Sequence, residues 1–139
     1  MLYDNDFITA EKQEEMAVER RDFYRSKGII LDIKRGIVPM KNLIATQAFV
    51  EGDKFREIYR RALEEGYNVP ILVEDHPDLM NYYLIDGHCR GKSTLMCGKN
   101  YIDSFILFSK NSGDFNSDYV KVASLLGNVY IRNLPIIEV

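Results

Sequence analysis

Residues 82–94 read YYLIDGHCRGKST, and this stretch decides how the chain is interpreted. The apolar residues 82–85 indicate a buried strand that breaks at Asp86-Gly87. A short helix is predicted to follow over residues 90–97, with Gly98 at its end. A helix that begins at the carboxyl end of a strand presents unpaired N–H groups and the positive end of its dipole, which favour an anion. The stretch therefore predicts a phosphate-binding site.

The side chains of the same stretch add to this prediction. Glycine lets the backbone approach a ligand closely, arginine and lysine supply charge, and hydroxyl groups donate hydrogen bonds. The expected phosphate-binding residues are Gly87, His88, Cys89, Arg90, Gly91, Lys92, Ser93 and Thr94. The simpler alternative is an Asp-Gly turn followed by solvated helix residues.

A Walker A loop is the first comparison, because Gly91-Lys92-Ser93 is the ending of that motif. The pattern G-x-x-x-x-G-K-[ST] requires glycine at position 86, where this chain has Asp86. Counting from Gly87 would leave the loop one residue short. The Walker A interpretation is therefore rejected.

Composition limits the classes of protein that need to be considered. The chain has 139 residues, of which 46% are hydrophobic and 28% charged, as expected for one soluble domain. A net charge of −3 argues against a surface made to bind nucleic acid. No apolar run is long enough to cross a membrane and no signal peptide is evident, so a cytoplasmic location is expected. Cys89, Cys97, His76 and His88 lack the spacing of a metal site, and His76 is expected at the surface.

The remaining sequence predicts a mixture of helices and strands. Helices are expected at 9–26, 53–65, 90–97 and 118–126, and strands at 29–33, 37–40, 69–73, 82–85, 104–108, 129–131 and 136–139, with a turn at 34–36. We predict a compact α+β domain over 29–139, a small mixed sheet with helices packed around it, preceded by a helical extension over 1–28. The apolar stripe of helix 9–26 is narrow, so this helix should lie outside the fold or against a partner.

The order of these elements resembles the ParB/sulfiredoxin superfamily, the ParB-like nuclease domain. The resemblance covers residues from about 37 to 107. It is carried by Ile37-Val38-Pro39, Ala45-Thr46-Gln47, the helix 53–65 with Gly66, Pro70-Ile71-Leu72-Val73, and the strand 84–85 that runs into G-x-x-R at residues 87–90. In that superfamily the G-x-x-R helix start binds nucleotide phosphates. The resemblance therefore implies a nucleotide ligand, ATP, ADP or CTP, with Mg²⁺.

The branches of the superfamily differ in the residues within and just before the G-x-x-R motif. Sulfiredoxin has G-C-H-R, whereas here the order is Gly87-His88-Cys89-Arg90, so His88 takes the place of the reactive cysteine. ParB has G-E-R-R and a downstream helix-turn-helix domain, for which the residues after 108 are too few. The form D-G-H-x-R most resembles the free-serine kinases. Their catalytic Glu, however, lies in a loop where this chain has Thr46-Gln47.

The first hypothesis is a nucleotide-dependent phosphotransferase or hydrolase. Asp86 and His88 would be its catalytic residues, and Thr46, Gln47 and Glu51 its second-substrate loop, contacting a small molecule. The alternative is a nucleotide-sensing or DNA-associated regulatory module without catalysis, although the charge does not indicate DNA. Nuclease activity is disfavoured, because no metal-ligating cluster is evident and the pI is about 5.4.

Overall fold

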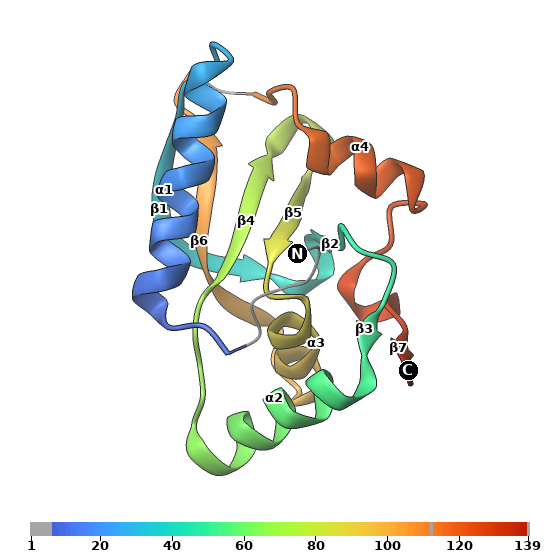
Figure 1. Ribbon diagram of the computed structural model, residues 1–139. Coiled ribbons are helices and arrows are strands. Elements are labelled where there is room, and N and C mark those ends of the chain that lie inside the picture. Colours follow the sequence, from blue (N-terminus) through green and yellow to red (C-terminus); the bar gives the residue numbers. More distant parts are fainter. Residues whose placement is uncertain (1–6, 112, 139) are drawn as a thin grey trace.

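A mixed sheet forms the centre of the computed structural model, which describes residues 7–111 and 113–138 (Figure 1). The sheet has five strands in the order β1-β6-β4-β5-β2. Their bounds are β1 Leu31–Pro39, β2 Leu43–Ile44, β4 Ile71–His76, β5 Asn81–Asp86 and β6 Tyr101–Ser109. The β1–β6 and β4–β5 pairs are antiparallel, and the β4–β6 and β2–β5 pairs are parallel. A separate parallel pair joins β3 (Val50–Glu51) to β7 (Ile136–Ile137).

The helices pack around this sheet, so the predicted α+β class is confirmed. They are α1 Ala10–Ser26, α2 Gly52–Glu65, α3 His88–Met96 and α4 Asp118–Leu125, with 3₁₀ turns η1 Met40–Asn42, η2 Pro77–Leu79 and η3 Ile131–Asn133. Helix α1 runs along the strands, while α2 and α3 lie together at one end of the sheet (Figure 1). Phe55 and Ile58 form the buried face of α2, and Gly66, in the left-handed conformation, ends that helix as predicted.

Two apolar clusters cover the two faces of the sheet. Alternation along a strand sends successive side chains to opposite faces. In β4, Leu72 packs with α1, whereas Ile71 and Val73 belong to the larger cluster with α2 and α3. In β6, Phe105 likewise faces α1 and Ile106 faces the larger cluster. The central strands are therefore buried on both sides, which explains their unbroken apolar runs.

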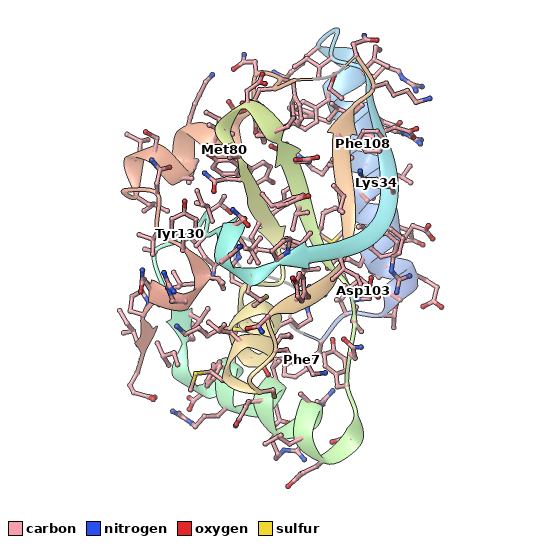
Figure 2. The ribbon with its side chains drawn as sticks, turned by 180° about the vertical axis from the view of Figure 1, so that it is seen from behind. Phe7, Lys34, Met80, Asp103, Phe108 and Tyr130 are labelled. Carbon is pink, nitrogen blue, oxygen red and sulfur yellow. The ribbon has the colours of Figure 1, made fainter. Side chains whose placement is uncertain are left out.

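Two predictions of local structure are wrong. The expected turn at 34–36 is the middle of β1, which runs unbroken beside β6, with Lys34 next to Phe108 (Figure 2). Pairing along the full length of β6 outweighs the local preference of Lys34-Arg35-Gly36 for a turn. The expected strand at 129–131 is a single bridge, Ile44 to Tyr130, followed by η3.

Smaller differences concern helix ends and faces. Helix α3 begins at His88, two residues before the predicted start. Helix α4 buries Ala123, whereas Val122, one residue earlier, is 39% exposed.

His76 was predicted at the surface, yet it is fully buried. Strand β4 extends to His76, so Leu72, Glu74 and His76 all point to the face covered by α1. His76 Nε2 lies 2.9 Å from Glu74 Oε1, and Ser117 Oγ donates to the same oxygen at 2.5 Å. Tyr24 Oη, from α1, donates to Glu74 Oε2. We call these four residues the Glu74 cluster; its hydrogen bonds join α1, β4 and the residue that caps α4.

The Glu74 cluster makes the stability of the protein sensitive to alkaline pH. Burial, and then the charge of Glu74, raise the pKa of Tyr24 above its usual value of about 10. The folded chain therefore keeps a proton that the unfolded chain loses, so this contribution is complete below about pH 10 and falls above it. In urea titrations between pH 8 and 11, the free energy of unfolding should fall less steeply for Tyr24→Phe than for the wild type.

The control for this experiment is Tyr101→Phe, because the side chain of Tyr101 is 60% exposed. Its alkaline slope should equal that of the wild type. At pH 7, Tyr24→Phe should lower the free energy of unfolding by about 1.5–3 kcal/mol, since Glu74 loses a donor. Equal slopes for wild type and Tyr24→Phe would contradict the assignment.

Candidate functional site

The start of α3 is built by a glycine at the end of β5. Gly87 is the N-cap of the helix and has φ 111°, a conformation that residues with a side chain rarely adopt. A Cβ atom there would lie 2.6 Å from Ile71 Cγ2 and 2.9 Å from Arg90 Nη2. The position therefore requires glycine. As predicted, β5 delivers the chain directly to a helix N-terminus, with its positive dipole end at the strand's carboxyl end.

Arg90 faces the protein interior instead of an open ligand site. Its guanidinium donates to Pro70 O at 2.7 Å and Val69 O at 3.3 Å. It also donates to Gln13 Oε1 at 2.6 Å and to Asp86 Oδ2 at 3.3 Å. The residue is only 4% exposed. Arg90 thus joins α1, the segment before β4 and the end of β5, and these donors are already used by protein acceptors.

The later residues of the predicted phosphate site also turn inward. Lys92 Nζ donates to Ile131 O at 3.3 Å and to Arg132 O at 2.9 Å, so this ammonium holds η3. Burial lowers the pKa of Lys92. Thr94 Oγ1 donates to Arg90 O at 2.8 Å.

Gly91 and Ser93, which alternate with Arg90, Lys92 and Thr94 in the sequence, are buried as well. Gly91 lies against η3, where a Cβ atom would meet Ile131 at 3.5 Å. The Ser93 hydroxyl is enclosed and has no hydrogen-bond partner among the described residues. The structure therefore gathers residues 86–90 around the end of β5 and directs Lys92 to the other side of α3.

The predicted second-substrate loop meets this site through one residue. Thr46 N donates to His88 Nε2 at 2.9 Å, and Thr46 Oγ1 donates to Leu84 O. Gln47 Nε2 donates to Phe49 O at 3.0 Å within the loop. The carboxylate of Glu51 lies at the start of α2, 3.5 Å from Lys54 Nζ. Thr46 therefore lies at the α3 start, whereas the other two side chains make contacts within their own segment.

The two residues predicted to be catalytic are both buried and engaged. Asp86 is 3% exposed and ion-paired to Arg90. His88 is 1% exposed, and because its Nε2 accepts from Thr46 N, the proton of the neutral ring lies on Nδ1. Cys89 is 3% exposed and belongs to the larger apolar cluster, a structural position. Proton transfer by Asp86 or His88 would require these contacts to open.

Gln13 is the residue at this site that the sequence analysis missed. It is fully buried in α1 and provides one of the two acceptors for Arg90 Nη2, the other being Asp86 Oδ2. A signal was present, because Gln13, Ala17 and Tyr24 are spaced by four and seven residues, which places them on one helix face. An uncharged amide on that face, within a helix rich in Glu, Lys and Arg, marks the contact side of α1.

Within 7–111 and 113–138, no helix is long and apolar enough to cross a membrane. Over the same residues, no group of three or more His, Cys, Asp or Glu side chains is placed to hold a metal ion.

Comparison with known proteins yields likenesses in structure. No protein-family model matches the sequence, and no curated protein matches it either. Among solved structures, a protein from Agrobacterium tumefaciens is similar with a TM-score of 0.50 and 19% identity, over 71% of this chain and 51% of that one. This likeness, with the order of strands and helices from β1 to α3, concerns the fold. The chain shares the fold of that protein, and its own order of elements is the one expected for a ParB/sulfiredoxin-like domain.

ParB structures are among the similar ones. A Pnob8-like ParB-N domain has a TM-score of 0.46 and 18% identity, covering 69% of this chain and 36% of that one. The C-terminally truncated chromosome-partitioning protein ParB from Caulobacter crescentus, complexed with CTP-γ-S, has a TM-score of 0.45 and 18% identity, covering 68% and 52%. The chain thus spans about half or less of the length of the solved chains it matches.

The buried ion pair at the α3 start should be essential for stability. Arg90→Ala would leave Asp86 buried without this partner, so the free energy of unfolding should fall by about 3–5 kcal/mol. Arg35→Ala is the matched control, because Arg35 forms an ion pair with Asp103 at the surface, with 2.7 Å between Arg35 Nη2 and Asp103 Oδ2. An exposed ion pair of this kind contributes about 0–1 kcal/mol to the free energy of unfolding. Urea unfolding followed by circular dichroism measures both. Equal losses for the two variants would show that Arg90 is not the buried link described above.

Proposed function

We propose that the chain is a nucleotide-binding domain in which the start of α3 binds phosphate oxygens. The observation that carries the proposal is the turn at Gly87, which brings β5 directly into the N-terminus of α3, where the first backbone N–H groups have no partner within the helix. The helix dipole favours negative charge at this point. Thr46, which contacts His88 from the neighbouring loop, places a second backbone segment beside it.

The cationic groups of Arg90 and Lys92 are engaged with other parts of the protein. Because their cationic groups donate to protein atoms, phosphate binding would rely on the backbone of the α3 first turn, and Arg90 would position that turn through Asp86. The nature of the nucleotide is suggested by a similar structure, since the Caulobacter crescentus ParB is described as complexed with CTP-γ-S. CTP is therefore the first ligand to test, followed by ATP and ADP. Mg²⁺ would be held chiefly by the phosphates themselves.

Between the two hypotheses, the contacts favour binding without turnover, as in a nucleotide-sensing regulatory module. Asp86 is ion-paired with Arg90, and His88 accepts a hydrogen bond from Thr46 N. Neither is in position to accept a proton from a substrate unless these contacts break. The phosphotransferase or hydrolase remains the second candidate, because Asp86, His88 and Thr46 do lie together at the α3 start.

Thr46→Asp provides a direct test of the site. A carboxylate beside the α3 start would compete with and repel a phosphate group, so the affinity for CTP–Mg²⁺ should fall about tenfold or more. Asn116→Asp is the control, because it makes the same charge change at an exposed position on the loop before α4. Affinity is measured by isothermal titration calorimetry, and backbone amide shifts of residues 87–90 locate the ligand.

Turnover is measured separately, by ³¹P NMR of CTP, ATP and ADP with Mg²⁺, with and without free serine. Binding without release of phosphate or a phosphorylated product supports the regulatory module, and turnover that Asp86→Asn abolishes supports the enzyme. The proposal fails if no nucleotide binds at millimolar concentration, or if Thr46→Asp and Asn116→Asp bind CTP equally.

A further inference from the structure

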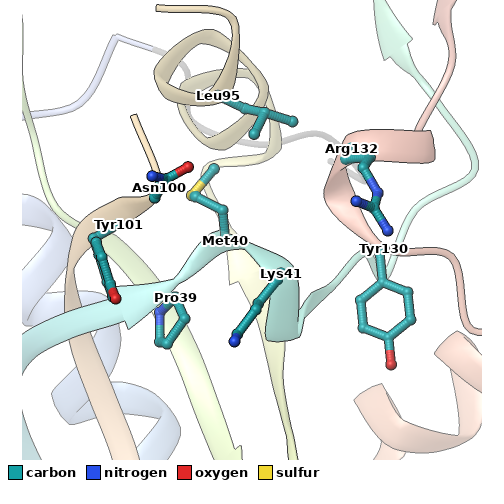
Figure 3. A pocket seen from close by; sticks show the side chains of 8 residues that line it. All are labelled: Pro39, Met40, Lys41, Leu95, Asn100, Tyr101, Tyr130 and Arg132. Atoms are coloured by element: carbon teal, nitrogen blue, oxygen red, sulfur yellow. The ribbon is translucent and has the colours of Figure 1, made fainter. Parts of the chain in front are cut away.

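A cavity lies at the opposite end of α3 from the proposed nucleotide site. Its volume is about 300 Å³, at the small end of the range for ligand pockets. Its walls come from the end of β1 and η1, the last turn of α3, the start of β6 and the segment around η3 (Figure 3). The lining side chains that matter here are Met40, Lys41, Leu95, Tyr101, Tyr130 and Arg132.

The charge of this cavity is positive. Lys41 and Arg132 are both exposed, and no carboxylate lines the cavity with them. Neither cation is ion-paired with any residue in the described part of the chain, whereas Arg56 and Arg60 each contact carboxylates. Two uncompensated cations in one concave site of an acidic protein favour an anionic group.

The remaining lining is apolar and aromatic. The side chain of Met40 points toward Leu95 at the back of the cavity (Figure 3). The Tyr130 hydroxyl donates to Asn81 Oδ1 at 3.2 Å, which fixes that ring at one side. Tyr101, at the other side, is 60% exposed. An apolar back wall between two tyrosine rings suits a flat ring system, which aromatic side chains contact favourably.

The walls are held in place by hydrogen bonds and do not depend on a ligand. Met40 N donates to Asn100 O at 2.9 Å, which joins η1 to the segment before β6. Lys92 Nζ donates to the carbonyls of Ile131 and Arg132, so α3 fixes the backbone that carries the Arg132 side chain. A preformed site loses less entropy when a ligand binds.

We propose that this cavity binds a small molecule that carries an anionic group on a flat ring, in contact with Lys41 and Arg132. The proposal does not rest on nucleotide binding at the α3 start, because no residue that lines this cavity belongs to residues 86–90 or to the loop that contains Thr46.

Amide-shift titrations with four probes test the ligand class. Phenyl phosphate and benzoate each combine an anion with a ring, whereas phenol and inorganic phosphate each have one of the two features. The first two should shift the amides of Lys41, Tyr101 and Arg132 at about fivefold or more lower concentration than the second two. The stronger of phenyl phosphate and benzoate shows whether the anion is phosphate or carboxylate.

Two single variants test the cations. Lys41→Ala and Arg132→Ala should each weaken binding of the stronger probe about fivefold or more. Arg25→Ala, which removes an exposed arginine at the end of α1, should not change it. Thr46→Asp should leave it unchanged as well, which separates this cavity from the nucleotide site. The inference is overturned if the probes shift only the amides of residues 87–90, if none binds at 10 mM, or if Arg25→Ala weakens binding as much as Arg132→Ala.

Discussion

A buried guanidinium determines how the parts of this fold are assembled. Arg90 can remain inside the protein only because α1, the segment before β4 and the end of β5 each provide it with an acceptor. These three segments are distant in sequence, and the same side chain contacts all of them. The start of α3, which is the candidate site, is therefore positioned by an electrostatic requirement as much as by apolar packing.

A second polar centre lies on the face of the sheet that α1 covers. Leu72 packs with α1 through apolar contact, whereas Glu74 and His76, further along the same strand, meet it in a network of hydrogen bonds. Helix α1 thus contacts Arg90 through Gln13 and Glu74 through Tyr24, eleven residues or about 16 Å further along the helix. Its narrow apolar stripe is explained by this division, because polar contacts at two places fix its orientation on the sheet.

The sequence was sufficient for features that depend on neighbouring residues. The strand that breaks at Gly87, the amphipathic α2 ending at Gly66 and the α+β class all follow from local pattern. The sequence was insufficient where contact with a distant segment determines the direction of a side chain or the extent of a strand. Arg90 lies three residues after Gly87 at a helix start, but the direction of its side chain is set by the acceptors on Gln13 and Pro70. Similarly, His76 is buried because β4 continues as far as this residue and pairs with β5. Strand β1 passes through an expected turn because β6 pairs with it throughout.

The double attachment of α1 has a consequence for local unfolding. If α1 detached by itself, Arg90 would lose the Gln13 acceptor and Glu74 would lose the Tyr24 donor, while Leu72, Phe105 and Leu107 became exposed to water. Detachment of α1 therefore costs the free energy of two buried hydrogen bonds in addition to that of exposing apolar side chains. The helix and the sheet should consequently open as one cooperative unit, with the amides of this highly charged surface helix protected from hydrogen exchange nearly as well as those of the central strands.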